Sequence, residues 1–201
     1  MQRRAVGPAA WLIDDLDDPA AWAASVRELR LDGVIEVVPA ERTVLVVCDR
    51  SEAQVLGERL DEVRVVGRDR TSTTTVVIDV VYDGADLVSV SAATGLQVDE
   101  VIDRHSSGLY TVAFCGFSPG FAYMKGLDPA LQVPRRDTPR TTVPAGSVAI
   151  AGDYTSVYPS ASPGGWHLIG TTTMVTWDAA APQPALLAPG TTVQFRDVER
   201  R

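Results

Sequence analysis

The segment PRRDTPR, at residues 134–140, concentrates positive charge in a chain whose net charge is -8. Its arginines are Arg135, Arg136 and Arg140. A guanidinium group binds a carboxylate or phosphate through paired hydrogen bonds, so this segment could capture a small anion. The alternative is a solvated loop whose arginines pair with Asp137 or Asp128. The prolines in and beside the segment would hold it rigid, which favours anion capture.

His105 is one of two histidines in the sequence, and it falls on the apolar side of a helix predicted to begin near Val98. Two interpretations are open. It is a half-buried histidine near the helix C-terminus, where the dipole favours the protonated ring, or it faces a site and transfers a proton with a tuned pKa. His167 has no second histidine or carboxylate at ligand spacing, so we expect no metal site in this chain.

Glycines and hydroxyl-bearing residues follow in the same part of the chain. In SPGGW, at residues 162–166, Gly164 and Gly165 permit close backbone approach, as in an anion-binding nest. The alternative is a plain turn in which Trp166 fills a core. Candidate substrate contacts through a hydroxyl group are Tyr123, Ser147 and Tyr158.

Ser118 lies in GFSPG, at residues 116–120, which matches the nucleophile-elbow pattern G-x-S-x-G. That elbow needs the backbone N–H of the residue after the serine, and a helix that starts there. Pro119 has no N–H group, and Pro119-Gly120 favours a turn. We therefore interpret GFSPG as a structural turn.

The composition restricts the partners of the chain. Its 201 residues carry a net charge of -8 and a pI of about 4.7, so phosphate backbones and anionic lipid surfaces would repel it. We expect neither nucleic acid nor a membrane as a partner. The two cysteines, Cys48 and Cys115, lie far apart, and no signal peptide is evident. These features favour a cytoplasmic protein with free thiols.

The first third of the chain is predicted to form a small α/β domain, residues 1–72. A strand is expected at residues 10–13, followed by a helix that Asp18 caps, Pro19 begins and Gly33 ends. Residues 34–38 and 43–47 form a predicted hairpin, and a second helix follows Ser51. This order is typical of half of a ferredoxin-like fold.

A polar stretch at residues 68–75 marks the predicted boundary, so the second domain is residues 73–201. It opens with a strand at 75–82 and two short helices, the first capped by Asp86. From Tyr110 to Thr171, prolines and glycines alternate with short apolar runs, which a helix cannot accommodate. Short strands and tight turns, closing in a last strand at 191–195, therefore predict a barrel or sandwich.

These motifs together resemble the B subunit of 5-oxoprolinase, also called allophanate hydrolase subunit 1, a group that includes a bacterial inhibitor of a sporulation histidine kinase. The resemblance covers essentially the whole chain and is weaker before residue 75. The matching text is Gly95-Leu96 with Glu100-Val101-Ile102 and His105, Gly116-Phe117 with Pro119-Gly120-Phe121 and Tyr123, Pro134-Arg135, Pro139-Arg140, Val143 to Val148, Ile150-Ala151-Gly152, Tyr158-Pro159 and Ser162 to Trp166.

The resemblance implies an α+β architecture, with a cyclophilin-like β-barrel after the small ferredoxin-like domain. It also implies a partner, the C subunit or allophanate hydrolase subunit 2, and a further A subunit; the pair resembles the carboxyltransferase region of urea carboxylase. The implied activity is hydrolysis of a cyclic amide C–N bond, the ATP-dependent opening of 5-oxo-L-proline to L-glutamate. The chain contains no P-loop, so ATP is bound through another kind of pocket or by a partner.

Two other functions are kept as alternatives, a regulatory histidine-kinase inhibitor and a component of allophanate hydrolase or urea carboxylase. For the enzyme, we expect Arg140 to recognise an anion and His105 to transfer or position a proton. Substrate contacts are expected from Tyr123, Arg135, Ser147, Tyr158, Gly164 and Gly165. The family usually has glycine at Ser156 and arginine at Thr171, and losing that arginine removes a possible anion contact.

Overall fold

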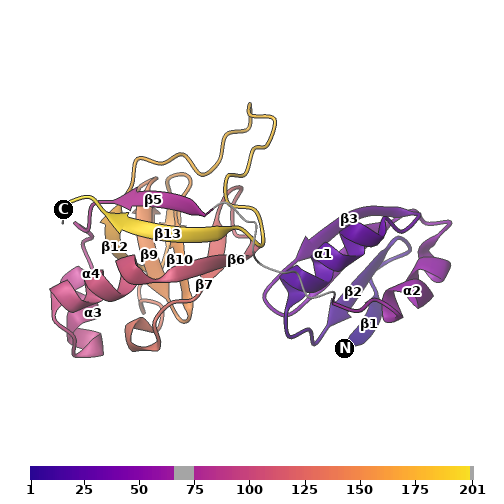
Figure 1. Cartoon of the computed structure of the whole chain (residues 1–201), viewed down its shortest axis with the longest axis horizontal. Coiled ribbons are helices and arrows are strands. Elements are labelled where there is room, and N and C mark those ends of the chain that lie inside the picture. The colour runs from indigo at the N-terminus through magenta and orange to yellow at the C-terminus, as the bar shows by residue number, and fades with distance from the viewer. Residues whose placement is uncertain (66–74, 200–201) are drawn as a thin grey trace. The chain divides into compact units, whose positions relative to one another are not determined.

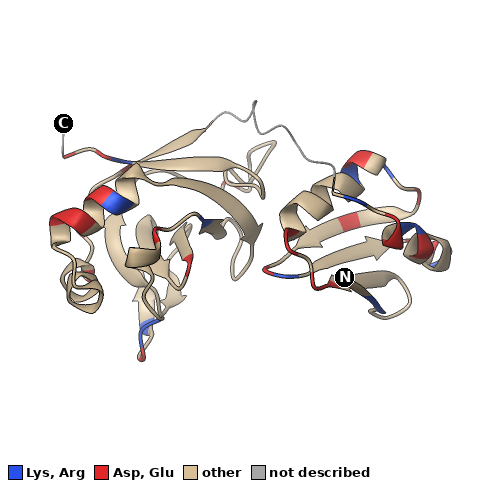
Figure 2. Ribbon diagram, turned by 60° about the horizontal axis from the view of Figure 1, so that its bottom comes forward, with Lys and Arg blue, Asp and Glu red and all other residues tan. Residues whose placement is uncertain are grey.

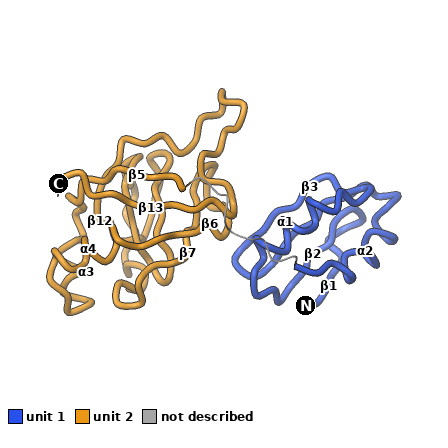
Figure 3. The backbone as a smooth tube through the Cα atoms, viewed as in Figure 1, with its two compact units in different colours: residues 1–72 blue, residues 73–201 orange. Residues whose placement is uncertain are grey.

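The computed structural model describes residues 1–65 and 75–199. Contacts divide the chain into two compact units, Met1–Ser72 and Thr73–Arg201 (Figures 1 and 3). The boundary predicted at residues 68–75 falls almost entirely within residues 66–74, which lie outside the described residues. Within the described parts, no helix is long and apolar enough to cross a bilayer.

The first unit packs two helices against one antiparallel sheet. Its elements are β1 (Gln2–Ala5), β2 (Ala10–Asp14), α1 (Pro19–Leu29), β3 (Val34–Pro39), β4 (Val44–Cys48) and α2 (Ala53–Asp61). The strand order is β1-β2-β4-β3. Trp22 and Val26 from α1 share one buried apolar cluster with Leu56 and Leu60 from α2. Both helices therefore cover the same face of the sheet.

The ferredoxin-like half is not confirmed for this unit. A ferredoxin-like fold runs strand, helix, strand, strand, helix, strand, whereas here two strands, β1 and β2, precede α1 and none is described between α2 and residue 65. Strand β1 forms the edge of the sheet beside β2. It pairs Gln2 with Asp14 and Ala5 with Trp11. The sequence of β1, QRRA, has no apolar alternation, so the pattern did not predict it.

The start of α1 follows its sequence signals. Asp18 accepts a hydrogen bond from the backbone N–H of Ala21 at 2.9 Å, and Pro19 is the first helical residue. The helix ends at Leu29, because Arg30 adopts a left-handed conformation with φ of 44°. The end predicted at Gly33 is thus wrong by one turn. Ser51 is not the cap of α2; Glu52 holds that position without a side-chain cap bond.

The second unit is built on a seven-stranded sheet that is nearly closed into a barrel. Its elements are β5 (Val76–Val80), α3 (Leu87–Thr94), α4 (Val98–Ser107), β6 (Leu109–Cys115), β7 (Ala122–Lys125), the short 3₁₀ helix η1 (Pro129–Leu131), β8 (Arg140–Val143), β9 (Ser147–Ala151), β10 (Tyr154–Val157), β11 (Ser162–Gly164), β12 (His167–Thr171) and β13 (Thr192–Asp197). The strand order is β12-β9-β10-β7-β6-β13-β5, and β8 pairs with β11 in a separate two-stranded sheet.

A backbone bridge joins the two edges of the seven-stranded sheet. Val81, just after β5, and Thr171, at the end of β12, exchange both backbone hydrogen bonds at 2.9 and 2.8 Å. This closure agrees with the predicted barrel and is consistent with a cyclophilin-like one. The helices α3 and α4 lie together beside the barrel (Figure 1).

Each face of the sheet carries its own apolar cluster, because side chains alternate along a strand. In β9, Val148 and Ile150 join the inner cluster together with residues of α3 and α4. Ala149 and Ala151 join an outer, aromatic cluster. That outer cluster consists of Phe121, Val143, Ala149, Ala151, Tyr154, Tyr158, Trp166 and Leu168, with Phe114 and Tyr123 packed against it. Strand β9 is thus buried on both faces.

Candidate functional site

The arginine segment is held against the β8–β11 pair. Arg140 begins β8 and lies opposite Gly164 of β11. The backbone N–H of Arg136 donates to the carbonyl oxygen of Gly165 at 2.8 Å. Four residues predicted to form a site are therefore brought into one neighbourhood: Arg135, Arg140, Gly164 and Gly165.

A buried carboxylate, Asp86, binds two of the arginines. Its oxygens accept two hydrogen bonds from Arg140, through Nη1 and Nη2, and one from Arg136 Nη1, each at 2.8 Å. The backbone N–H of Leu168 donates a fourth bond at 2.8 Å. Only 4% of the Asp86 side chain is exposed. The carboxylate thereby joins the start of α3 to β8, to β12 and to the segment that precedes β8.

The partners of Asp86 set its charge state. Burial raises the pKa of the Asp86 carboxyl, but the hydrogen bonds from Arg140 and Leu168 and the charges of both arginines outweigh it and hold that pKa below its usual value. The hydrogen bond to Asp86 also raises the pKa of Arg140. The group is therefore an ionised carboxylate between two guanidinium ions.

This arrangement corrects three predictions. Arg140 is not free to recognise an anion in this structure, since both of its Nη atoms bind Asp86. Asp137 and Asp128 are not the partners of the paired arginines, and Asp128 binds Arg104 instead. Asp86 occupies the N-cap position of α3, but its side chain makes no cap bond because the arginines and Leu168 take it.

Arg135 differs from its two neighbours. It is exposed, and within the described residues it takes part in no ion pair. Its charge acts on the hydroxyl of Tyr158, which is almost completely buried. Burial raises the pKa of Tyr158, while a hydrogen bond from the Trp166 backbone N–H and the charges of Arg135 and Arg140 oppose that rise. Arg135 is thus the cation of the segment that remains available beside a phenol group.

Gly164 and Gly165 do not form the predicted nest. Gly164 lies in strand β11 rather than a turn, and neither glycine has a positive φ. A nest needs successive N–H groups turned to one side by alternating backbone conformations. Gly164 serves close packing instead, since a Cβ there would lie 2.3 Å from the Tyr158 hydroxyl oxygen. Trp166 is buried in the outer cluster, as the alternative interpretation expected.

The side chains of two other predicted substrate contacts, Ser147 and Tyr123, interact with the protein itself. Ser147 is only 2% exposed, and its hydroxyl donates to the carbonyl oxygen of Pro144 at 2.9 Å, so it does not face a ligand. Tyr123 is half-buried and stacks on Phe114, with ring centroids 4.3 Å apart. It also meets the edge of Trp166 at 5.6 Å. Tyr123 therefore packs against the outer aromatic cluster, which also contains Tyr158.

His105 lies inside the barrel, away from solvent. Its exposure is 0%, and its ring packs against Phe195 with centroids 4.6 Å apart. Tyr82 donates its hydroxyl hydrogen to Nδ1 at 2.7 Å. Nε2–H donates to Thr155 Oγ1 at 2.8 Å, because the Thr155 hydroxyl itself donates to the carbonyl oxygen of Ala149.

Burial lowers the pKa of His105 from 6.5 to about 3, so the ring is neutral at physiological pH. Both sequence interpretations are therefore corrected: the ring is neither half-buried and protonated nor open to a substrate. Its two hydrogen bonds join α4 to the strand β10 and to Tyr82, which is a role in holding the barrel together.

The remaining sequence features have structural explanations. Residues 116–121 form a turn without a helix after Ser118, which agrees with the rejection of a nucleophile elbow. Ser156, at a usual glycine position, is fully buried in β10. Thr171, at a usual arginine position, closes the barrel through its backbone and donates its hydroxyl hydrogen to Asp83 at 2.9 Å. Neither substitution lies among the arginines.

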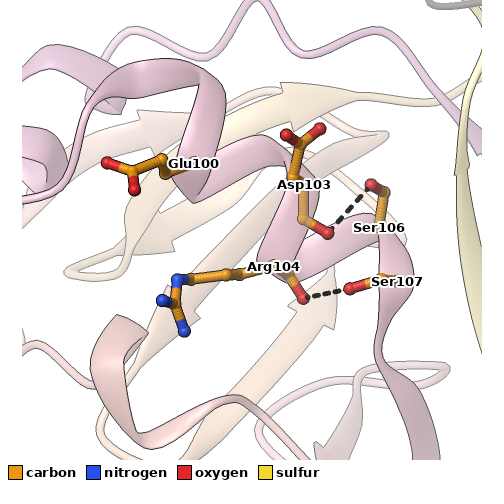
Figure 4. Close-up of a pocket in the computed structure, with 5 residues that line it drawn as sticks. All are labelled: Glu100, Asp103, Arg104, Ser106 and Ser107. Carbon is orange, nitrogen blue, oxygen red and sulfur yellow. Dashed lines mark hydrogen bonds between the residues drawn. The ribbon is translucent and has the colours of Figure 1, made fainter.

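A shallow hollow of about 540 Å³ lies elsewhere, along the outer side of α4 (Figure 4). It is lined by Glu100, Asp103, Arg104, Ser106 and Ser107. Figure 2 shows charged residues along α4 and none on α3. The two serines donate to backbone carbonyls of their own helix, and Arg104 binds Asp128. The hollow contains none of the residues predicted to form a site.

Comparisons with known proteins show the family to which this chain belongs. The family model for the carboxyltransferase domain, subdomain C and D, matches residues 6–187. The 5-oxoprolinase B subunit of Escherichia coli O157:H7 is 40% identical over 183 residues, 87% of this chain and 83% of its own length. The protein of the same name from Bacillus subtilis (strain 168) is 35% identical over 192 residues, 87% of this chain and 80% of its own. The chain belongs to the family of 5-oxoprolinase B subunits.

Solved structures agree with this fold. The crystal structure of TTHA0988 matches all of this chain with a TM-score of 0.81 and 33% identity. This chain spans only 41% of the length of TTHA0988, so it corresponds to one part of that longer protein. The urea amidolyase of K. lactis matches 98% of this chain with a TM-score of 0.71. At 19% identity, that likeness shows the fold alone.

Proposed function

We propose that this chain is the B subunit of an ATP-dependent 5-oxoprolinase, which opens the ring of 5-oxo-L-proline to give L-glutamate. The observation that carries this proposal is the 40% identity to the 5-oxoprolinase B subunit of Escherichia coli O157:H7 across 83% of that protein's length. The chain acts with two other chains, a C-type and an A-type subunit, because a protein named as a B subunit is one component of a larger enzyme. We place the complex in the cytoplasm.

The arginine segment supports a substrate that is a small anion. The substrate 5-oxo-L-proline carries one carboxylate beside its ring amide, and a guanidinium group binds a carboxylate through paired N–H donors. Arg135 is the exposed guanidinium of the segment, its charge acts on the Tyr158 hydroxyl, and Gly164 packs against that hydroxyl. In this proposal Arg135 binds the substrate carboxylate. The half-buried ring of Tyr123 offers the apolar surface on which the substrate ring rests, and Tyr158 is buried in the same aromatic cluster.

The amide of 5-oxo-L-proline is a weak electrophile. Transfer of the terminal phosphoryl group of ATP to its oxygen, with release of ADP, would activate the ring carbon. Water would then add to that carbon, the ring C–N bond would break and a second water would release phosphate, giving L-glutamate. This chain contributes binding and orientation to that reaction. Its sequence has no P-loop, and Arg136 and Arg140 are already bound to Asp86. We therefore assign ATP to a partner chain or to a surface completed by one.

The test is reconstitution. The chain is co-purified with the candidate C-type and A-type proteins, and L-glutamate release is measured from 5-oxo-L-proline with and without ATP. We expect release that requires ATP and all of the chains. Urea and allophanate are assayed in parallel. Turnover of either of them, but not of 5-oxo-L-proline, would contradict the proposal and favour the urea carboxylase or allophanate hydrolase alternative.

A further inference from the structure

Asp86 receives more hydrogen bonds than a helix cap requires. It lies at the start of α3, yet its carboxylate binds Arg136, Arg140 and the backbone of Leu168 rather than its own helix. These partners are 50, 54 and 82 residues away in sequence. A buried carboxylate is costly unless it is paired and hydrogen-bonded, and here both guanidinium groups are directed inward to meet it.

The pairing divides the three arginines into two kinds. Arg140 uses both Nη atoms on Asp86, and Arg136 uses Nη1 while its Nε is buried without a partner. The side chains of both are less than one-third exposed, at 25% and 31%. Arg135 is exposed and belongs to no ion pair in the described part of the chain. One guanidinium is thus left for an external anion.

The same pairing fixes the strand beneath Tyr158. Arg140 lies opposite Gly164, and the Gly164 backbone lies close against the Tyr158 hydroxyl. Arg136 donates its backbone N–H to Gly165, so the segment is attached at two points, to Gly164 of β11 and to Gly165 just after it. Moving either arginine would therefore move the backbone that carries Arg135 and the glycine that packs against Tyr158.

We propose that Asp86 is a positioning residue for an anion site. By binding Arg136 and Arg140 it holds residues 134–140 against β11 and leaves Arg135 as the guanidinium that takes a substrate carboxylate. The identity of that carboxylate rests on the proposed function, but the division of the arginines does not.

The division is tested with phenylglyoxal, a reagent that modifies free guanidinium groups, followed by peptide mass spectrometry of the purified chain. We expect Arg135 to react at least about ten-fold faster than Arg136 and Arg140, because hydrogen-bonded and buried groups are protected. Asp86→Asn should expose Arg136 and Arg140 to the reagent, and Asp86→Glu should restore much of their protection. Equal reactivity of the three arginines in the unaltered chain would overturn the proposal.

Asp79→Asn is the matched control. Asp79 on β5 forms a bidentate pair with Arg196 on β13 at 2.6 and 2.8 Å, and both side chains are more than half exposed. Its loss should raise the reactivity of Arg196 and leave that of Arg136 and Arg140 unchanged. A rise at Arg136 and Arg140 in this variant would mean that general loosening of the fold, and not Asp86, controls the arginines.

Kinetics of the assembled enzyme separate positioning from stability. With Asp86→Asn we expect KM for 5-oxo-L-proline to rise about ten-fold or more while kcat changes less than about three-fold, the pattern of lost ground-state binding. Asp86→Glu should recover part of that KM. An Asp86→Asn variant with a lowered Tm but an unchanged KM would show a structural role only. If the unaltered assembly shows no turnover, the proposed function fails, and the phenylglyoxal pattern still decides the role of Asp86.

Discussion

Gly164 lies so close to Tyr158 that a side chain would not fit between them: a Cβ at position 164 would approach the Tyr158 hydroxyl oxygen to 2.3 Å. The hydroxyl belongs to a side chain that is only 1% exposed, so it has little room to move away. The glycine and the phenol therefore determine each other's positions.

Gly164→Ala should destabilise the second unit by about 1–3 kcal/mol, the usual cost of overpacking a filled site. Urea unfolding measures the loss. The double variant Gly164→Ala with Tyr158→Phe should regain part of it, since the nearest clash is with the removed oxygen. Gly165→Ala is the control, because its nearest neighbour would lie at 3.6 Å and its φ is not positive. An equal loss at positions 164 and 165 would contradict the close packing.

Replacing Arg135 or Arg140 by alanine should change different properties of the protein. Arg140→Ala leaves the buried Asp86 short of a partner and should cost about 3 kcal/mol, as breaking a buried ion pair does. Arg135→Ala removes an exposed side chain that forms no ion pair with any described residue, so stability should change by less than about 0.5 kcal/mol. In the assembled enzyme, Arg135→Ala should nevertheless raise KM for 5-oxo-L-proline. A stable Arg140→Ala variant, or an Arg135→Ala enzyme with unchanged KM, would argue against these assignments.

His105 should make the fold sensitive to acid. Its pKa is about 6.5 when unfolded and about 3 when folded, so the unfolded chain binds the proton first. Its contribution is present in full above pH 6.5 and falls as the pH decreases toward 3, by about 1.4 kcal/mol per pH unit. Between pH 7 and pH 5 the expected loss from this one group is about 2 kcal/mol.

The control for this predicted loss of stability is the variant His105→Gln, which lacks the imidazole ring. Urea unfolding of both proteins at pH 7 and pH 5 cancels the contributions of the groups that the two proteins share. The unaltered chain should lose more stability on acidification than the variant does. The same loss in both would show that His105 gains a proton in the folded barrel.

Thr155 should matter through its hydroxyl rather than its shape. Thr155→Val keeps the volume but removes the acceptor for His105 Nε2–H, which would leave a buried donor unpaired at a cost of about 1–3 kcal/mol. Thr155→Ser keeps the hydroxyl and should cost less than the valine variant. Thermal unfolding of the three proteins at neutral pH tests the order, and a valine variant as stable as the native chain would contradict the assigned hydrogen bond.

Local chemistry in the sequence predicted the local structure well. Asp18 and Pro19 mark the start of α1 because a cap and a first-turn proline act within three residues of each other. The turn at Pro119-Gly120 and the strand β5 likewise follow from their own residues. What a short stretch specifies by itself could be predicted from it.

Long-range pairing could not be predicted in the same way. Nothing near Asp86 in sequence indicates that Arg136, 50 residues later, is its partner, so the helix-cap interpretation was the reasonable one. Periodicity placed His105 on the inner side of α4, but only the surrounding strands determine that it is fully enclosed and neutral. Burial depth and ion-pair partners are properties of the closed barrel, and no window of the sequence contains them.

The closure through Val81 and Thr171 also indicates where the barrel should open locally. Strands β5 and β12 meet there by one bridged pair, whereas β9 and β12 share four paired positions. Separating the strands at this seam would therefore break fewer paired strand positions than separating β9 from β12. The backbone amides of Val81 and Thr171 should therefore exchange with deuterium before those of β9. This seam is the part of the barrel that we expect to open first.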